Sequence, residues 1–325
     1  MTGRDIVVIG ASMGGLEALK NIVPSLPEDL PAAIFIVLHT SEDSPGVLPD
    51  LLNRISNLPV LYAANNMAVR PGRIYIARPG QHLSLEKDVM KLSAGPKENR
   101  HRPAIDVLFR SAAASYGEQV IGVVLSGNLD DGSAGLRDIK LRGGMCIVQD
   151  PERALAASMP VNAIEAAQPE FVLPVEQIAD KIVTLVGASD LQTKASDNGG
   201  GTLHQTHATY SCPACHGSLQ EVVEGGMVRF RCRVGHKYSA ESLLEDQAEA
   251  VEKALWAAIR SLEEHSEVAA RLAKKWSERN HSRLSKQFSR RAQASGEHAR
   301  TLRLFLDTTD EVREPVPEEH NDKVA

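Results

Sequence analysis

Aromatic residues are scarce in this sequence, since Phe, Tyr and Trp make up only 4% of its 325 residues. The cores must therefore be packed mainly with aliphatic side chains, which supply most of the 42% hydrophobic content. No apolar run reaches the roughly 18 residues that a transmembrane helix needs, so we expect no membrane insertion. The apolar run near the N-terminus is also too short for a secretory signal peptide.

A strong excess of one charge is lacking too, since 36 Lys and Arg residues oppose 42 Asp and Glu residues, for a formal net charge of −6. This balance predicts no general attraction to nucleic acid or to an anionic membrane surface. Only four cysteines are present, and three of them cluster between 212 and 232. That clustering favours a metal site in a reducing compartment over a disulfide framework, so we expect a cytoplasmic protein.

Residues 1–187 alternate short apolar runs with helical patterns. This alternation is typical of βαβ units, and it predicts an α/β domain built on a doubly wound, mostly parallel sheet. At 70–77 the hydrophobic period falls to two, and together with 82–85 and 89–92 this segment predicts an antiparallel excursion. The Gly- and Ser-containing stretch 188–209 then predicts a flexible linker.

The C-terminal part of the sequence predicts a small cysteine-bearing module at 210–238 and a helical hairpin at 239–306. Apolar and small residues recur in alternating steps of four and three from Leu255 to Trp276, which is heptad spacing. The first half of this helical region is acidic and the second half basic, so an antiparallel hairpin would bring opposite charges together. An acidic tail follows at 307–325. Self-association through the helices stays open.

Three residues of the types found in nucleophilic triads follow the ends of apolar, strand-like runs. They are Ser12, His39 and Asp131. In an open α/β sheet, ligands bind just beyond the carboxyl ends of the parallel strands. The three side chains are therefore predicted to converge on one crevice, with a hydroxyl, an imidazole and a carboxylate available for acyl transfer.

The serine lies in a glycine-rich loop, GASMGG at 10–15, between a strand and a helix. Free amides at the helix start, including that of Met13, can stabilise an oxyanion there. A dinucleotide-binding loop is one alternative, but it requires G-x-G-x-x-G and an acidic residue where this chain has His39. An α/β-hydrolase elbow is a second alternative, although the order Ser, His, Asp differs from its order Ser, acid, His. A plain tight turn is the third.

The motifs in this region are VIGASMGGLEAL at 8–19, NRHRPAIDVLF at 99–109 and DDGSAG at 130–135, with His39 after the second strand. Over about residues 5–187 they resemble the chemotaxis protein-glutamate methylesterase (CheB) family. The resemblance implies hydrolysis of L-glutamate γ-methyl esters on methylated chemoreceptors or related signalling proteins. It also implies deamidation of protein glutamine as a second activity, and no cofactor for catalysis.

The resemblance also implies roles for individual residues. Ser12 would be the nucleophile, His39 the general base and Asp131 the acid that orients it. Arg100 and Arg102 are candidates for recognising acidic groups that flank the ester. The alternative for both arginines is a set of salt bridges that hold the loop before the next helix.

Several features depart from the family pattern. The chain begins at the catalytic domain without a receiver domain, so we expect no control by phosphorylation in cis. Asn128 stands where well-known members have methionine, and we keep it with Met13 as a candidate oxyanion or substrate residue. The histidine is followed by Thr-Ser in place of Met-Pro. Asp130 competes with Asp131 for the role of the acid, and the position relative to Gly132 favours Asp131.

The cysteine module has the spacing C-x₂-C-x₁₆-C-x₃-H, formed by Cys212, Cys215, Cys232 and His236. This spacing predicts a structural zinc ribbon of the Cys₃His type, whose metal supplies most of the folding energy of so small a unit. His216 is an alternative fourth ligand, and a metal-free fold is the other alternative. The mixed local charge favours contact with protein over nucleic acid.

The remaining candidates are interpreted as structural. Asp106 is read as an acidic residue in the first turn of a helix, and His82 and His101 as structural histidines. Cys146 lies inside a strand and is expected to be an inert core thiol. Two other functions stay open: a non-catalytic signalling adaptor that keeps the esterase fold, and an esterase with a non-receptor substrate.

Overall fold

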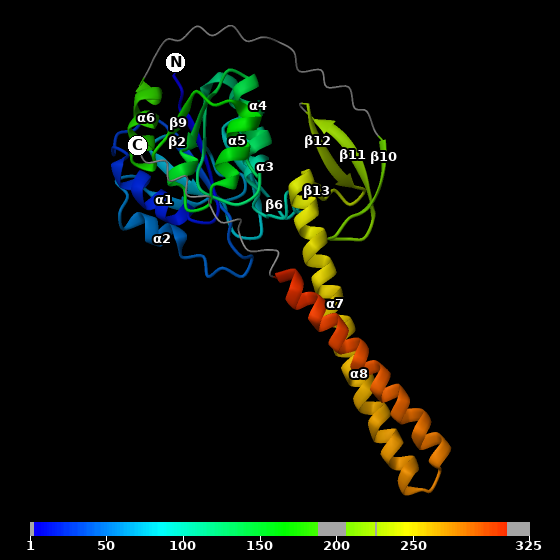
Figure 1. Cartoon of the computed structure of the whole chain (residues 1–325). Helices are drawn as coiled ribbons and strands as arrows, with labels where there is room; N and C mark the ends of the chain where they lie inside the picture. Colours follow the sequence, from blue (N-terminus) through cyan, green and yellow to red (C-terminus); the bar gives the residue numbers. More distant parts are fainter. Residues whose placement is uncertain (1–2, 188–205, 225, 311–325) are drawn as a thin grey trace, which may run out of the picture. The chain divides into compact units, whose positions relative to one another are not determined.

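Figure 1 shows the computed structural model, which describes residues 3–187, 206–224 and 226–310. The chain divides into two compact units, Met1–Leu244 and Glu245–Ala325. Most of the predicted linker, and the predicted tail from 311 onward, lie outside the described residues. A strand already begins at Thr206, within the stretch predicted to be linker.

The first unit is built around a sheet of seven strands in the order β3-β4-β2-β1-β7-β8-β9, and all of its pairings are parallel. Its strands are β1 (Ile6–Ala11), β2 (Ala33–Leu38), β3 (Val60–Tyr62), β4 (Arg73–Ile76), β7 (Val120–Val124), β8 (Met145–Gln149) and β9 (Phe171–Leu173). Every residue of β1, β2 and β7 is buried, because a parallel sheet covered on both faces needs apolar residues on both. The predicted doubly wound α/β domain is confirmed.

Helices cover both faces of this sheet (Figure 1). They are α1 (Gly15–Ile22), α2 (Leu48–Asn53), α3 (Ile105–Tyr116), α4 (Ser133–Leu141), α5 (Ser158–Ala167) and α6 (Val175–Gly187), with short 3₁₀ turns at Val23–Ser25, Gly117–Gln119 and Pro151–Arg153. Val7 and Ile9 of β1 pack toward α1 and α6. Ile6 and Val8 pack toward α3, α4 and α5 on the other face.

The predicted antiparallel excursion is only partly present. β5 (His82–Glu86) and β6 (Val89–Ser93) do form an antiparallel hairpin, but β4 lies in the main parallel sheet between β2 and β3. The prediction for 70–77 was wrong because a period of two indicates a strand with one buried face, whereas Ile74, Tyr75 and Ile76 of β4 are all buried. Tyr75 is buried and stacks on Phe35, while its hydroxyl accepts a hydrogen bond from the Arg70 amide at 3.1 Å.

The cysteine module forms a separate antiparallel sheet in the order β10-β11-β12-β13. Its strands are β10 (Thr206–Ser211), β11 (Ser218–Glu224), β12 (Met227–Cys232) and β13 (Lys237–Tyr238). A small core lies on one face of this sheet, formed by Cys212, Leu219, Phe230, Cys232, Tyr238 and Leu243. The module has little apolar area to bury, as its length implied.

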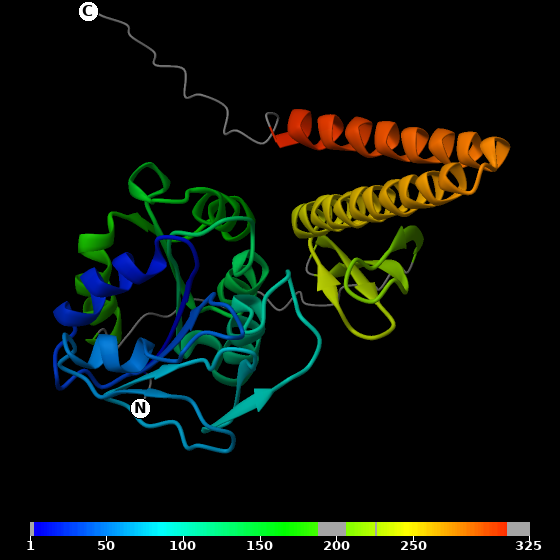
Figure 2. The ribbon, with the colours of Figure 1, turned by 90° about the horizontal axis from the view of Figure 1, so that it is seen from below.

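Two long helices follow, α7 (Ala240–Glu278) and α8 (Ser282–Asp310). Within the second unit they lie side by side and antiparallel (Figure 2). Ser266 donates a hydrogen bond to the Ala292 carbonyl at 2.8 Å, and Arg303 pairs with Glu263 at 2.7 Å. α8 runs four residues beyond the expected end of the hairpin at 306. Across the described parts of the chain, no helix combines the length and the apolar character that crossing a membrane requires.

The close approach of β1 to α3 predicts the effect of a methyl group at Gly10. A Cβ atom there would overlap Ile105 of α3, so Gly10→Ala should lower the free energy of unfolding by about 1–3 kcal/mol. Gly187→Ala is the matched control, since a Cβ at that position would meet no atom within 4 Å. Urea unfolding measures both. Equal midpoints for the two variants would contradict the close packing.

Candidate active site and metal centre

The strand ends of the main sheet bring the predicted triad residues to one edge. β1 and β2 pair in register up to Ala11 and Leu38. Ser12 and His39 directly follow these two residues, so each lies at the carboxyl end of one of two neighbouring strands. The Ser12 amide donates to the Ser126 carbonyl at 3.0 Å, and the His39 amide donates to the Ala11 carbonyl at 3.0 Å. The serine, histidine and aspartate loops therefore leave the sheet side by side.

His39 and Asp131 are joined by a buried hydrogen bond. His39 Nε2 lies 2.9 Å from Asp131 Oδ2, and the two side chains are 4% and 2% exposed. An ionised carboxylate can only accept, so Nε2 carries the hydrogen and Nδ1 presents its lone pair. Nδ1 is buried and has no hydrogen-bond partner among the described residues. The described residues also contain no hydrogen bond between the Ser12 side chain and His39, a bond that often tightens only when substrate binds.

The Asp131 carboxylate is surrounded by donors. Besides His39, it accepts from the amides of Ile105 at 2.6 Å and Asp106 at 3.2 Å, both at the start of α3, and from Asn99 Nδ2 at 3.0 Å. Burial by itself raises the pKa of Asp131, but the hydrogen bonds from His39 and Asn99 hold that pKa well below its usual range. Asp131 is therefore held as a carboxylate.

His101 has a closer relation to the site than the sequence indicated. Its ring stacks on His39 with 3.5 Å between centroids and 8° between planes. Burial, with His39 adding to the effect, lowers the pKa of His101 to about 3, so it stays neutral beside the base. His82 is structural as interpreted, because Nε2 lies 2.9 Å from the Pro96 carbonyl and Nδ1 accepts from the Ala104 amide.

Asp106 does more than begin a helix. It is fully buried, and its Oδ1 accepts from the amides of Gly132 at 3.1 Å and Gly135 at 2.7 Å. These two bonds tie α3 to the loop that carries Asp131. Sequence reasoning missed this role because a first-turn acid has a sufficient local explanation at the helix start.

Met13 and Asn128, the candidate oxyanion or substrate residues, lie together at the surface. Met13 is 57% exposed, and Asn128 Nδ2 is 3.6 Å from its sulfur. The Met13 carbonyl accepts from Ser126 Oγ at 2.7 Å, and Gly14 follows with a φ of 76°. This fixes the backbone beside Ser12, and the oxyanion role stays a prediction.

The two candidate arginines differ in their surroundings. Arg102 donates to the Gly95 carbonyl at 2.9 Å and pairs with Glu42 at 3.3 Å, which is the loop-holding arrangement. Arg100 borders an open polar depression next to the histidine pair. That depression is lined by Thr40, Ser41, Glu42, Asp43, Lys97, Arg100, His101 and Arg102.

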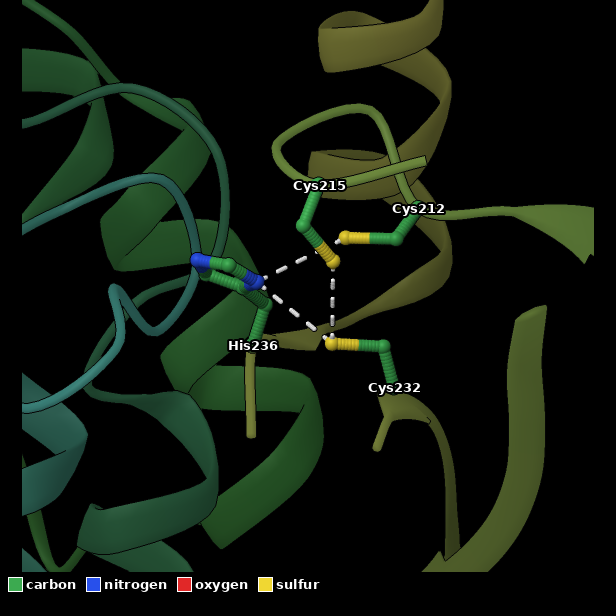
Figure 3. Close-up of side chains that lie close together, drawn as sticks. All are labelled: Cys212, Cys215, Cys232 and His236. Atoms are coloured by element: carbon green, nitrogen blue, oxygen red, sulfur yellow. Dashed lines mark hydrogen bonds between the residues drawn. The ribbon is translucent and has the colours of Figure 1, made fainter. Parts of the chain in front are cut away.

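The four predicted metal ligands converge (Figure 3). The donor atoms of Cys212, Cys215, Cys232 and His236 all lie within 4.8 Å of one another. The Cys215 and Cys232 sulfurs are 3.6 Å apart, and the Cys232 sulfur is 3.4 Å from His236 Nδ1. Ligands about 2.3 Å from a tetrahedral zinc ion stand roughly 3.7 Å apart, so this donor set fits zinc. His216 is not part of the group.

The other two candidates occupy separate places. Asp130 accepts from Ser239 Oγ at 2.8 Å, and burial raises its pKa to about 6. Cys146 is buried in β8, where burial raises the pKa of its thiol and Sγ lies 3.4 Å from the Leu136 carbonyl. It is the inert core thiol that was expected.

Comparison with known proteins finds relatives for the first unit. The family model described as CheB methylesterase matches residues 7–182. A Xanthomonas campestris protein-glutamate methylesterase/protein-glutamine glutaminase is 39% identical over 187 residues, which are 56% of this chain and 53% of that protein. A Leptospira interrogans protein, whose name assigns the same activities provisionally, is 40% identical over 182 residues, or 56% of this chain and 94% of its own length. The crystal structure of the Thermotoga maritima CheB methylesterase catalytic domain has a TM-score of 0.55 and 36% identity, and it covers 57% of this chain and 100% of that domain.

The raised pKa of Asp130 predicts a pH-dependent effect on stability. The fold disfavours the ionised form of Asp130. The free energy of unfolding of the wild type should therefore fall as the pH rises from about 3.8 toward about 6. Asp130→Asn keeps an acceptor for Ser239 and should unfold at higher urea than wild type at pH 8, with no difference below pH ~4. Asp29→Asn, at an exposed position, is the charge-matched control. An Asp130→Asn advantage that is equal at both pH values would contradict the prediction.

Proposed function

Because the chain belongs to the CheB methylesterase family, we propose that it is a serine esterase that hydrolyses γ-methyl esters of glutamate side chains in proteins. The observation that carries the proposal is the buried His39–Asp131 hydrogen bond beside the Ser12 loop. That bond leaves one ring nitrogen, Nδ1, as the base, without a partner among the described residues. A base held in this way is what a serine hydroxyl needs to become a nucleophile.

In the proposed mechanism, Ser12 Oγ attacks the ester carbonyl while its proton passes to His39 Nδ1. The oxyanion is stabilised by backbone amides at the start of α1, that of Met13 included. The imidazolium returns the proton to the leaving oxygen, and methanol departs. Water then attacks the acyl-enzyme with His39 again as base, which releases glutamate. Asp131 holds the ring tautomer and stabilises the imidazolium in both steps.

The same attack on a glutamine side chain releases ammonia in place of methanol, and both activities stand in the names of the relatives. We propose methylated chemoreceptors or related signalling proteins as substrates, in the cytoplasm. We propose that Arg100, which lines the polar depression beside the histidines, contacts acidic residues that flank the ester.

We further propose that Cys212, Cys215, Cys232 and His236 hold a structural zinc ion. The support is the convergence of three thiols and one imidazole at the spacing that tetrahedral coordination requires. Four protein ligands leave no open position for a substrate. Zinc would therefore stabilise the small module and take no part in ester hydrolysis.

Replacing the nucleophile tests the esterase proposal. Ser12→Ala should reduce methanol release from a methylated receptor peptide by about 10⁴-fold or more, because the hydroxyl forms the acyl-enzyme. Ser25→Ala changes an exposed serine beyond α1 and should leave the rate unchanged. Equal rates for Ser12→Ala and wild type would overturn the proposal, and the non-catalytic adaptor would then be the better description.

Removing one thiol tests the metal site. Cys215→Ser should lower bound zinc, measured by mass spectrometry of the purified chain, from about one ion per chain to a small fraction of that. It should also make the module more sensitive to proteolysis, because the remaining core is small. His216→Ala, next to Cys215 but outside the cluster, should keep its zinc. Full zinc content in Cys215→Ser would contradict the assigned ligand set.

A further inference from the structure

Arg229 of β12 is buried by residues outside the cysteine module. Phe230 and Cys232 face the small core of the module, and side chains on a strand alternate between faces. Arg229 therefore points to the opposite face, the one it shares with the exposed Arg231. Yet Arg229 is only 4% exposed. The residues that cover its guanidinium group belong to the α/β domain.

The guanidinium group of Arg229 makes two hydrogen bonds to that domain. Nη2 donates to Asp106 Oδ2 at 2.8 Å, and Nη1 donates to Asn99 Oδ1 at 3.0 Å. Asp106 and Asn99 are 0% and 1% exposed. A buried guanidinium is tolerated only where it is paired and hydrogen-bonded, so this contact is specific rather than incidental.

The Arg229 contact leads directly to the candidate acid. Asn99 Nδ2 donates to Asp131 Oδ1 and to Asp106 Oδ2, each at 3.0 Å. An amide has one oxygen and one NH₂ group, so the donors that bind Oδ1 fix which end faces the carboxylates. Arg229 Nη1 is the nearer of these donors at 3.0 Å, and the Ser239 amide follows at 3.3 Å. With Oδ1 turned to Arg229, the NH₂ group faces Asp131. If the amide flipped, its oxygen would face two carboxylates instead.

Charge supports the same arrangement. Asp106, Asp130 and Asp131 are carboxyl groups in one small region. Burial raises the pKa of Asp106 and of Asp130, the charge of Asp131 raises both further, and the charge of Asp106 adds to the effect on Asp130. Arg229 is the partner with the largest favourable charge effect on Asp106, with Arg110 adding to it. Lys237 of the module and Ser239, just after it, make further contacts beside Arg229. The Asn99 amide donates to the Lys237 carbonyl at 3.0 Å, and Ser239 Oγ donates to Asp130.

We propose that Arg229 is a positioning residue for ester hydrolysis, through which the cysteine module orients the triad acid. Its guanidinium fixes the Asn99 amide and pairs with Asp106, and these two residues hold Asp131 against His39. The inference rests on the proposed esterase function. It makes the module a support of the active site rather than a spacer between the catalytic domain and the helices.

The test compares full-length Arg229→Gln with wild type, and with Arg231→Gln as the control on the same strand. Arg229→Gln should lower kcat for methanol release by about 10-fold or more, with KM within about twofold, because Arg229 lies outside the polar depression. Arg231→Gln should match wild type in both. Guanidinium ion at millimolar concentration should restore part of the kcat of Arg229→Ala. A purely structural defect would not respond to it.

A second readout does not need activity. The proton on His39 Nε2, hydrogen-bonded to Asp131, should give a downfield NMR signal in wild type that shifts or broadens in Arg229→Gln and persists in Arg231→Gln. A folded Arg229→Gln variant with wild-type kcat and an unchanged signal would overturn the inference. If Arg229→Gln does not fold, Arg229→Lys decides, because lysine keeps the charge but has one nitrogen in place of the two that donate to Asn99 and Asp106. Wild-type kcat in Arg229→Lys would also overturn it.

The two proposals fail in distinguishable ways. If wild type releases no methanol above the Ser12→Ala background, the esterase proposal is wrong. The NMR signal then still reports whether Arg229 orients the Asp131–His39 pair.

Discussion

A buried carboxylate that must stay ionised is the constraint on which the candidate site depends. Asp131 is out of contact with water and is stable as an anion only because donors reach it from several segments: the start of α3, the loop before α3, and the end of β2. Those segments must therefore hold one arrangement. Asp106, at the start of α3, ties that helix to the segment that carries Asp131 by accepting from the amides of Gly132 and Gly135.

The cost of placing several acids together is offset by charge brought from elsewhere in the chain. Arg110 lies on α3 and also pairs with Glu98, whereas Arg229 comes from a module more than a hundred residues further along. A strand of the module also runs beside the loop of Asn99 through backbone hydrogen bonds. The candidate catalytic acid, its supporting amide and the cysteine module are thus one hydrogen-bonded network. Two of the four candidate metal ligands adjoin the strands that present Arg229 and Lys237, with Cys232 at the end of β12 and His236 just before β13.

The parallel sheet supplies the rest of the geometry. Strands that are buried on both faces must be apolar along their length, so polar side chains can appear only where the strands end. Adjacent ends of β1, β2 and β7 then place a hydroxyl, an imidazole and a carboxylate loop at one edge. The mainly aliphatic cores also bring side chains close to the backbone, and Ile105 against Gly10 is an example next to the site.

By itself the sequence predicted the α/β class, the sheet edge that carries Ser12, His39 and Asp131, and the four candidate metal ligands that converge in the structure, because strand ends and ligand spacing are local signals. It misplaced β4, since a period of two indicates a strand with one buried face and β4 is buried on both. Only the tertiary structure decided that His101 stacks on His39, that Asn99 and Asp106 brace Asp131, and that Arg229 reaches them from another sheet. Those contacts join residues that lie far apart in the chain. The burial of each side chain depends on the segments that pack over it, and its neighbours in sequence do not reveal which segments these are.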